Sequence, residues 1–213
     1  MSAREEILAR IRASLADVPA GDKGHVKWEY GRPTPNDDVL GRFVDMCVDY
    51  KAVVERVPAA QTGDTVAALL KSKDAKTVVV PPGIDQAWRA AIEKAGVQIV
   101  DDDPPRGHKE LDAIDAVVTA AAVGIAETGT VVLDHSPDQG RRALSLVPDV
   151  HVCVVRADQV VSDVPEAVAR LEPAIKAGQP LTWISGGSAT SDIELSRVEG
   201  VHGPRKLLIV LAT

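Results

Sequence analysis

Residues 77–83 read Thr-Val-Val-Val-Pro-Pro-Gly, a short β-branched run that ends in two prolines and a glycine. A continuous apolar run of this length, followed by residues that break regular structure, is typical of a strand buried on both faces of a sheet. Residues 84–95 have the pattern of a helix closed by Gly96, and residues 97–100 form the next short apolar run. This strand–helix–strand order predicts an α/β fold with a mostly parallel sheet flanked by helices.

The same alternation extends in both directions along the chain. We expect further helices from residues 36–38 through Val54 and at 62–71, 141–146 and 165–176, and further strands at 116–122, 151–155, 181–184 and 206–211. Residues 124–134 have strand-like runs on both sides of Thr128-Gly129. They predict a hairpin, which we expect to join the sheet as an antiparallel element.

The chain is expected to divide into an N-terminal helix with a linker, residues 1–36, and an α/β domain, residues 37–213. Ser2 and Glu5 have the spacing of a capping box, and apolar residues recur behind them at helical intervals. Residues 17–36 are rich in proline, glycine and charge and show no periodicity, which is typical of a linker. The helix either docks on a partner or folds back on its own domain.

Composition excludes several classes of protein. The 213 residues include 24 Lys and Arg against 31 Asp and Glu, a net charge of −7, which argues against a dedicated nucleic-acid binder. Aromatic residues make up only 3%, too few for a base-stacking platform. No apolar run approaches the roughly 18 residues of a membrane span, and no signal peptide is visible. We therefore expect a soluble, cytoplasmic protein.

The chain has two cysteines, Cys47 and Cys153, far apart in sequence. Two thiols are too few for an iron–sulfur cluster with four cysteine ligands or for a closed Cys-rich zinc site. Both lie in apolar patterns, so we expect them to be small buried side chains.

The most informative stretch is residues 184–194, Ile-Ser-Gly-Gly-Ser-Ala-Thr-Ser-Asp-Ile-Glu. A strand leads into two glycines, a cluster of hydroxyls and then a predicted helix. Such a turn exposes main-chain amides to a ligand, and a helix N-terminus attracts anions. The candidate ligand-binding residues here are Ser185, Gly186, Gly187, Ser188, Thr190, Ser191 and Asp192. The alternative is a helix cap formed by Ser191 and Glu194.

His202 is a second candidate because two glycines and a proline surround it in residues 200–204. Histidine carries protons near neutral pH, and Glu199 nearby would fix its tautomer. Arg205 is a candidate to bind a carboxylate or phosphate. Two alternatives stay open: a structural loop, and metal ligation by Asp192, Glu199 and His202, although their spacing matches no metal motif.

Glu127 is the third candidate, together with Thr128 and Gly129 beside it. If it were buried in this small, apolar setting, its pKa would rise and it could act as a base or nucleophile. Otherwise it is an edge-strand carboxylate paired with a lysine or arginine. His135 at the next turn could reach the same site, whereas Asp101-Asp102-Asp103 is expected to be a solvated loop.

The motifs at residues 124–130, 185–194 and 197–205, in this order, resemble those of the lactate-utilisation protein C family, which contains the LUD domain. The resemblance implies a fold like that of ribose-phosphate isomerases and CoA-transferases. It also implies a role in a three-protein system that oxidises L-lactate to pyruvate, in which Cys-rich partners carry the iron–sulfur clusters. It assigns no catalytic residue to this chain.

Three functions are compatible with these observations. The first is a non-redox subunit that binds no cofactor itself and contacts a small carboxylate substrate and the iron–sulfur partners. The second is a free-standing enzyme of CoA-transferase or isomerase type that uses Glu127, with a homo-oligomer supplying the second half of its site. The third is a regulatory protein that binds a small carboxylate or phosphate.

Overall fold

The computed structural model describes residues 2–19, 31–190, 198–199 and 203–213. The chain divides into two compact units, residues 1–30 and residues 31–213. In the first unit, α1 (Ala3–Ser14) begins after Ser2, whose hydroxyl accepts a hydrogen bond from the amide of Glu5. The Glu5 carboxylate accepts one from the Ser2 amide at 2.7 Å. The predicted capping box is therefore confirmed, and none of the side chains of α1 is buried.

The main sheet of the second unit has six strands among the described residues. Its order is β1 (Val53–Val57), β12 (Lys206–Ala212), β7 (Val150–Arg156), β4 (Ala116–Ala120), β2 (Thr77–Val80) and β3 (Gln98–Asp101). Every neighbouring pair in this sheet is parallel. The α/β fold with a mostly parallel sheet is therefore confirmed.

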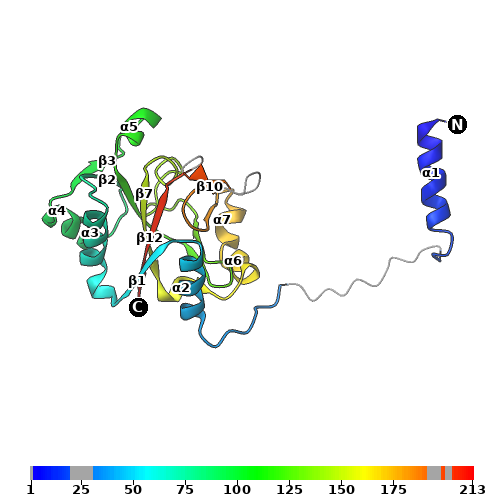
Figure 1. Cartoon of the computed structure of the whole chain (residues 1–213), viewed down its shortest axis with the longest axis horizontal. Coiled ribbons are helices and arrows are strands. Elements are labelled where there is room, and N and C mark those ends of the chain that lie inside the picture. Colours follow the sequence, from blue (N-terminus) through cyan, green and yellow to red (C-terminus); the bar gives the residue numbers. More distant parts are fainter. Residues whose placement is uncertain (1, 20–30, 191–197, 200–202) are drawn as a thin grey trace. The chain divides into compact units, whose positions relative to one another are not determined.

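Helices cover both faces of this sheet. Figure 1 shows α3 (Thr62–Ser72) and α4 (Gln86–Lys94) on one side of the sheet and α2 (Val39–Asp49) on the other. Successive side chains of β7 pack on opposite faces of the sheet. Val152 lies in the core cluster under α3 and α4, whereas Cys153 lies in the cluster that includes residues of α2. Because successive strand residues point to opposite faces, the continuous apolar run of β7 is buried on both sides.

The predicted hairpin exists, but it does not join the main sheet. It consists of β5 (Val123–Ile125) and β6 (Thr130–Leu133) and belongs to a second, four-stranded sheet with β8 (Val160–Val161) and β9 (Thr182–Ile184). The preceding strand, β4, already pairs with β2 on one edge and β7 on the other, so no edge remains for the hairpin. The small sheet instead packs on the α2 side.

Three other sequence predictions are wrong in detail. Val54 lies in β1 and not in the preceding helix, since α2 ends at Asp49. Residues 141–146 form turns. Residues 165–176 form two helices, α6 (Val164–Arg170) and α7 (Glu172–Lys176), because Pro173 has no amide hydrogen to continue the first helix.

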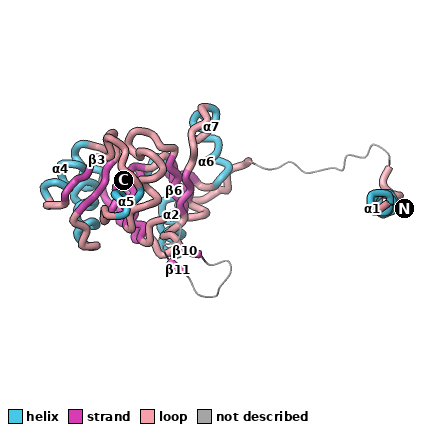
Figure 2. Tube along the Cα trace, turned by 90° about the horizontal axis from the view of Figure 1, so that it is seen from above, coloured by secondary structure: helices cyan, strands magenta, loops and turns pink. Residues whose placement is uncertain are grey.

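The remaining helical elements are short. They are α5 (His108–Asp112) and the 3₁₀ turns η1 (Ala59–Gln61) and η2 (Ala157–Gln159). Viewed from above, residues 31–213 have α4 and β3 at one end and α6 and α7 at the other, with β6 between them (Figure 2). In the part of the chain that the structure describes, no helix has the length and apolar character needed to cross a membrane.

Candidate functional site

Two of the motifs singled out in the sequence meet in the small sheet. The turn that joins β5 to β6 contains Thr128, and the segment after β9 begins with Ser185. The hydroxyl of Thr130 lies 2.7 Å from that of Thr128 and 2.8 Å from that of Ser185. β6 and β9 pair antiparallel, which brings the two segments to the same end of the sheet. A chain of three hydroxyls therefore connects motifs more than fifty residues apart.

Glycines allow both segments to press against the C-terminal end of α2. Gly129 and Gly186 have φ values of +56° and +79°, in the left-handed region that side chains rarely adopt. A Cβ at Gly129 would lie 2.5 Å from the carbonyl carbon of Met46, and one at Gly186 would lie 2.6 Å from the carbonyl oxygen of Tyr50. A Cβ at Gly187 would overlap the carbonyl oxygen of Arg205. These three glycines thus hold the two turns in place.

A cavity of about 250 Å³ opens beside the segment after β9. Its wall includes residues 182–188, and the rest is formed by residues 145–146, 203–204, His151 and Leu207. We call it the Gly/Ser cavity. It brings together four predicted ligand-binding residues, Ser185, Gly186, Gly187 and Ser188.

His151 is the residue of this cavity that sequence reasoning missed. It lies on β7, is fully buried, and its Nε2 is 2.8 Å from the hydroxyl of Thr119. Its Nδ1 is the one buried side-chain nitrogen or oxygen without a hydrogen-bond partner among the described residues. Desolvation lowers the pKa of His151 to about 4, so the imidazole is neutral near pH 7. A polar residue inside the apolar run at 150–155 was the signal for it.

Glu127 is exposed rather than buried. Its carboxylate lies 3.3 Å from the guanidinium of Arg42 on α2, and 52% of its side-chain surface is accessible. The burial that would make it an unusual base is absent, and the alternative arrangement, a carboxylate paired with an arginine, is the one observed. His135 does not bond to Glu127 either: its two ring nitrogens contact the Gly140 carbonyl and the Thr182 hydroxyl, each at 2.9 Å.

Arg205 contributes its main chain, but not its guanidinium, to this region. The guanidinium lies 3.5 Å from the carboxylate of Asp149, and both side chains are more than half exposed. Next to it, the Pro204 carbonyl accepts a hydrogen bond from the Ser188 amide at 2.7 Å. The arginine is therefore directed toward Asp149.

Parts of the second and third motifs lie outside the described residues, among them Ser191, Asp192 and His202. The same holds for the predicted Ser191–Glu194 helix cap. For Thr190 and Glu199 the structure describes only the main chain, in which β10 (Ala189–Thr190) pairs antiparallel with β11 (Val198–Glu199). The roles proposed for Asp192, Glu199 and His202 thus stay predictions. Among the residues that are described, no group of three or more metal-ligating side chains occurs.

A second, larger cavity of about 1010 Å³ lies at the carboxyl ends of β2 and β3. The chain passes from β2 outward to β3 and then returns to β4 on the other side of β2. Such a reversal of strand order is a common place for ligands in α/β sheets. This wall includes His135, Asp102 and Arg141.

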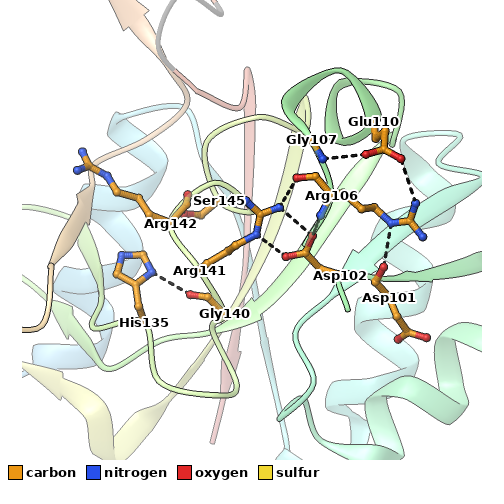
Figure 3. Close-up of polar contacts among 10 residues, drawn as sticks. All are labelled: Asp101, Asp102, Arg106, Gly107, Glu110, His135, Gly140, Arg141, Arg142 and Ser145. Atoms are coloured by element: carbon orange, nitrogen blue, oxygen red, sulfur yellow. Dashed lines mark hydrogen bonds and ion pairs between the residues drawn. The ribbon is translucent and has the colours of Figure 1, made fainter. Parts of the chain in front are cut away.

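Asp102 is a buried, ion-paired residue in the wall of this larger cavity. The expectation that residues 101–103 form a solvated loop is therefore wrong for Asp102. Its side chain is only 6% exposed and binds the Arg141 guanidinium through two hydrogen bonds, at 2.5 and 2.8 Å (Figure 3). It also accepts the amide of Arg106 at 2.9 Å. The hydrogen bonds from Arg141 hold the pKa of Asp102 below its usual value. The sequence signal for Asp102 was its position, since it follows directly after the end of β3.

The fold and the site define an α/β protein with an all-parallel main sheet and a small cavity between that sheet and a second one. The family model of the LUD domain matches residues 40–212, and the chain belongs to this family.

Several known proteins are similar to this chain. The Lactate utilization protein C of Deinococcus radiodurans is 46% identical over 98% of this chain and 95% of its own length. A protein of the same name from Bacillus velezensis is 25% identical over 82% of this chain and 78% of its own length. A crystal structure of a DUF162 family protein from Deinococcus radiodurans superimposes with a TM-score of 0.73 at 44% identity, covering 85% of this chain and all of the other.

Proposed function

We propose that this chain takes part in lactate utilisation as a non-redox subunit of a system that oxidises L-lactate to pyruvate. The observation that carries the proposal is the 46% identity, over nearly the whole chain, with a relative named Lactate utilization protein C. The contribution of the chain is to bind the small carboxylate in the Gly/Ser cavity. The electrons pass through iron–sulfur clusters on partner proteins.

The burial of the two cysteines supports the proposal that the iron–sulfur clusters lie on partner proteins and not on this chain. Cys47 and Cys153 are both buried in one apolar cluster with residues of α2 and the small sheet. Burial raises the pKa of each thiol to about 12, so neither forms the thiolate that binds iron. These cysteines are core residues, and the clusters of such a system would have to lie elsewhere.

Purification of the tagged chain from cells that grow on lactate tests the proposal. We expect iron, acid-labile sulfide and L-lactate-dependent dye reduction in the complex, and none of them in the chain produced alone. Removal of the chain from the complex should abolish lactate oxidation, and adding it back should restore it. The Cys47→Ala variant should leave the iron content unchanged. Lactate oxidation by the isolated chain would contradict the proposal, as would a complex that oxidises lactate without it.

A further inference from the structure

The larger cavity, at the carboxyl ends of β2 and β3, has a wall that the fold holds in place. The Gly83 amide donates to the Pro137 carbonyl at 2.9 Å, and a Cβ at Gly83 would lie 2.6 Å from the Pro137 carbonyl carbon. Arg141 is fixed by its hydrogen bonds to Asp102 and to the Arg106 carbonyl, the latter at 2.7 Å. A preformed wall costs a ligand little in ordering, which favours binding.

The two loops that follow these strands are not suited to phosphate groups. Residues 81–84, after β2, begin with two prolines that have no amide hydrogen, and the other two amides donate to main-chain carbonyls. Residues 104–106, beyond β3, repeat this pattern: two prolines precede Arg106, whose amide donates to the Asp102 carboxylate. Phosphate-binding loops are built from several free amides. We therefore expect an anionic ligand of this cavity to be bound by side chains.

Arg142 is the cation in this wall that is free to bind an anion. Two other arginines line the cavity, but Arg89 pairs with Asp101 at 3.0 Å and Arg141 pairs with Asp102. The Arg142 side chain is exposed, and no acidic group among the described residues pairs with it. Figure 3 shows it extending away from the Arg141–Asp102 pair. A guanidinium can bind a carboxylate through two parallel N–H donors.

The acidic residues of the wall limit the charge of the ligand. Asp103 lines the cavity and has no partner in the part of the chain that the structure describes, and the Asp101 side chain is 61% exposed. These two carboxylates would repel a second negative group on the ligand. A ligand with a single carboxylate, bound at Arg142, avoids that cost. The wall therefore favours a monoanion.

Much of the remaining wall is apolar and leaves room for a sizeable ligand. It includes four prolines and two aliphatic residues, namely Pro82, Pro105, Pro137, Pro180, Val80 and Leu144. The cavity measures about 1010 Å³, at the upper end of the roughly 300–1,000 Å³ of drug-sized ligand sites. An apolar ring placed against these side chains would be removed from water, which is favourable. A three-carbon acid such as lactate would fill little of this volume.

We propose that the larger cavity binds an organic monocarboxylate whose body is an apolar ring. The carboxylate accepts hydrogen bonds from the Arg142 guanidinium, and the ring packs against the prolines. Nucleotides do not suit this site, because their phosphates need free amides and further cations that the described wall does not offer. The site is separate from the Gly/Ser cavity and does not depend on the proposed function.

Calorimetric titration of the full chain at pH 7 with 4-phenylbutyrate, 4-phenylbutan-1-ol and 4-phenylbutylamine tests this assignment. The three probes share one apolar body and end in a negative, a neutral and a positive group. We expect 4-phenylbutyrate to bind about fivefold more tightly than either of the others, and ATP not to displace it. A preference below about twofold, no binding of 4-phenylbutyrate, or its displacement by ATP would overturn the assignment.

Two variants test whether the preference comes from Arg142. Arg142→Gln keeps a polar side chain at an exposed position and removes the charge, so the preference for 4-phenylbutyrate should fall to less than about twofold. The matched control is Arg56→Gln, on the edge strand β1 and outside this cavity, which should keep the preference. Both arginines are exposed, so we expect both variants to fold. A preference that survives in Arg142→Gln would show that another group binds the carboxylate.

Main-chain NMR signals of the unaltered chain locate the bound probe. 4-Phenylbutyrate should shift the amide signals of residues 140–142, which line the larger cavity, and leave those of residues 185–187, in the Gly/Ser cavity, unchanged. Shifts confined to residues 185–187 would refute the site. The proposed function is tested by L-lactate-dependent dye reduction in the complex, which uses none of these probes. The two proposals therefore fail separately.

Discussion

At the scale of single residues, two polar side chains stand out because each is buried for a different reason. Asp102 satisfies its carboxylate within the fold, through Arg141 and the Arg106 amide. His151 does not satisfy Nδ1 within the described residues. An unpaired buried polar atom costs about 1–3 kcal/mol of stability, so Nδ1 of His151 is a site at which the fold loses stability.

The Asp102→Asn variant should lower the free energy of unfolding by about 2–4 kcal/mol at pH 7. The change leaves Arg141 partly buried without its carboxylate, and breaking a buried pair by removing one partner is costly. The matched control is Asp103→Asn, at an exposed neighbouring position, which should change stability by less than about 0.5 kcal/mol. Urea titration of both variants measures these differences.

The effect of Asp102→Asn should also depend on pH. The pKa of Asp102 is lowered in the folded protein, so its carboxylate contributes stability above the unfolded pKa of about 3.9. That contribution is lost as the pH falls through the folded value. The gap between wild type and variant should therefore be full at pH 6 and shrink steadily below pH 4. A gap that does not change with pH would mean that the variant acts through packing and not through the ion pair.

At the scale of elements, sequence patterns located the four inner strands of the main sheet because the apolar run of each is buried on both sides. The runs at 77–80, 116–120, 150–156 and 206–212 are strands of one sheet. The hairpin was also predictable, but its sheet was not, because pairing depends on which strand edges are free. The end of α2 was missed because Val54 continues the helical spacing across a turn at Lys51, whose φ is +64°.

The Gly129→Ala variant tests how the β5–β6 turn is held on α2. It should lower the free energy of unfolding by about 3–5 kcal/mol, from the left-handed backbone and from the overlap with Met46. Gly96→Ala is the matched control, since Gly96 also has a positive φ of +81° but nothing within 4 Å of a new Cβ. That control should cost only about 1–2 kcal/mol. Similar losses in both variants would show that the contact with α2 contributes nothing.

At the scale of the whole molecule, the four apolar core clusters belong to residues 31–213. The first unit, residues 1–30, contains α1, which buries no side chain. Hydrophobic burial is the main favourable term in folding, so the second unit has what it needs to fold alone.

A chain that starts at Gly31 should therefore unfold in urea with a free energy within about 1 kcal/mol of the full chain, because it keeps every core cluster. Circular dichroism at matched protein concentration measures both transitions. A loss of more than about 2 kcal/mol would show that the first unit contributes to the stability of the second.

The sequence by itself determined the α/β class, five of the six described strands of the main sheet, the capping box of α1 and the glycine-rich segments near the site. These are local properties, since apolar period, turn residues and caps act over a few positions. Only the tertiary structure decided that Thr128 and Ser185 share a hydroxyl chain, that Glu127 is exposed, and that His151 lines the cavity. Burial and hydrogen-bond partners depend on which distant segments meet, and no local pattern records that.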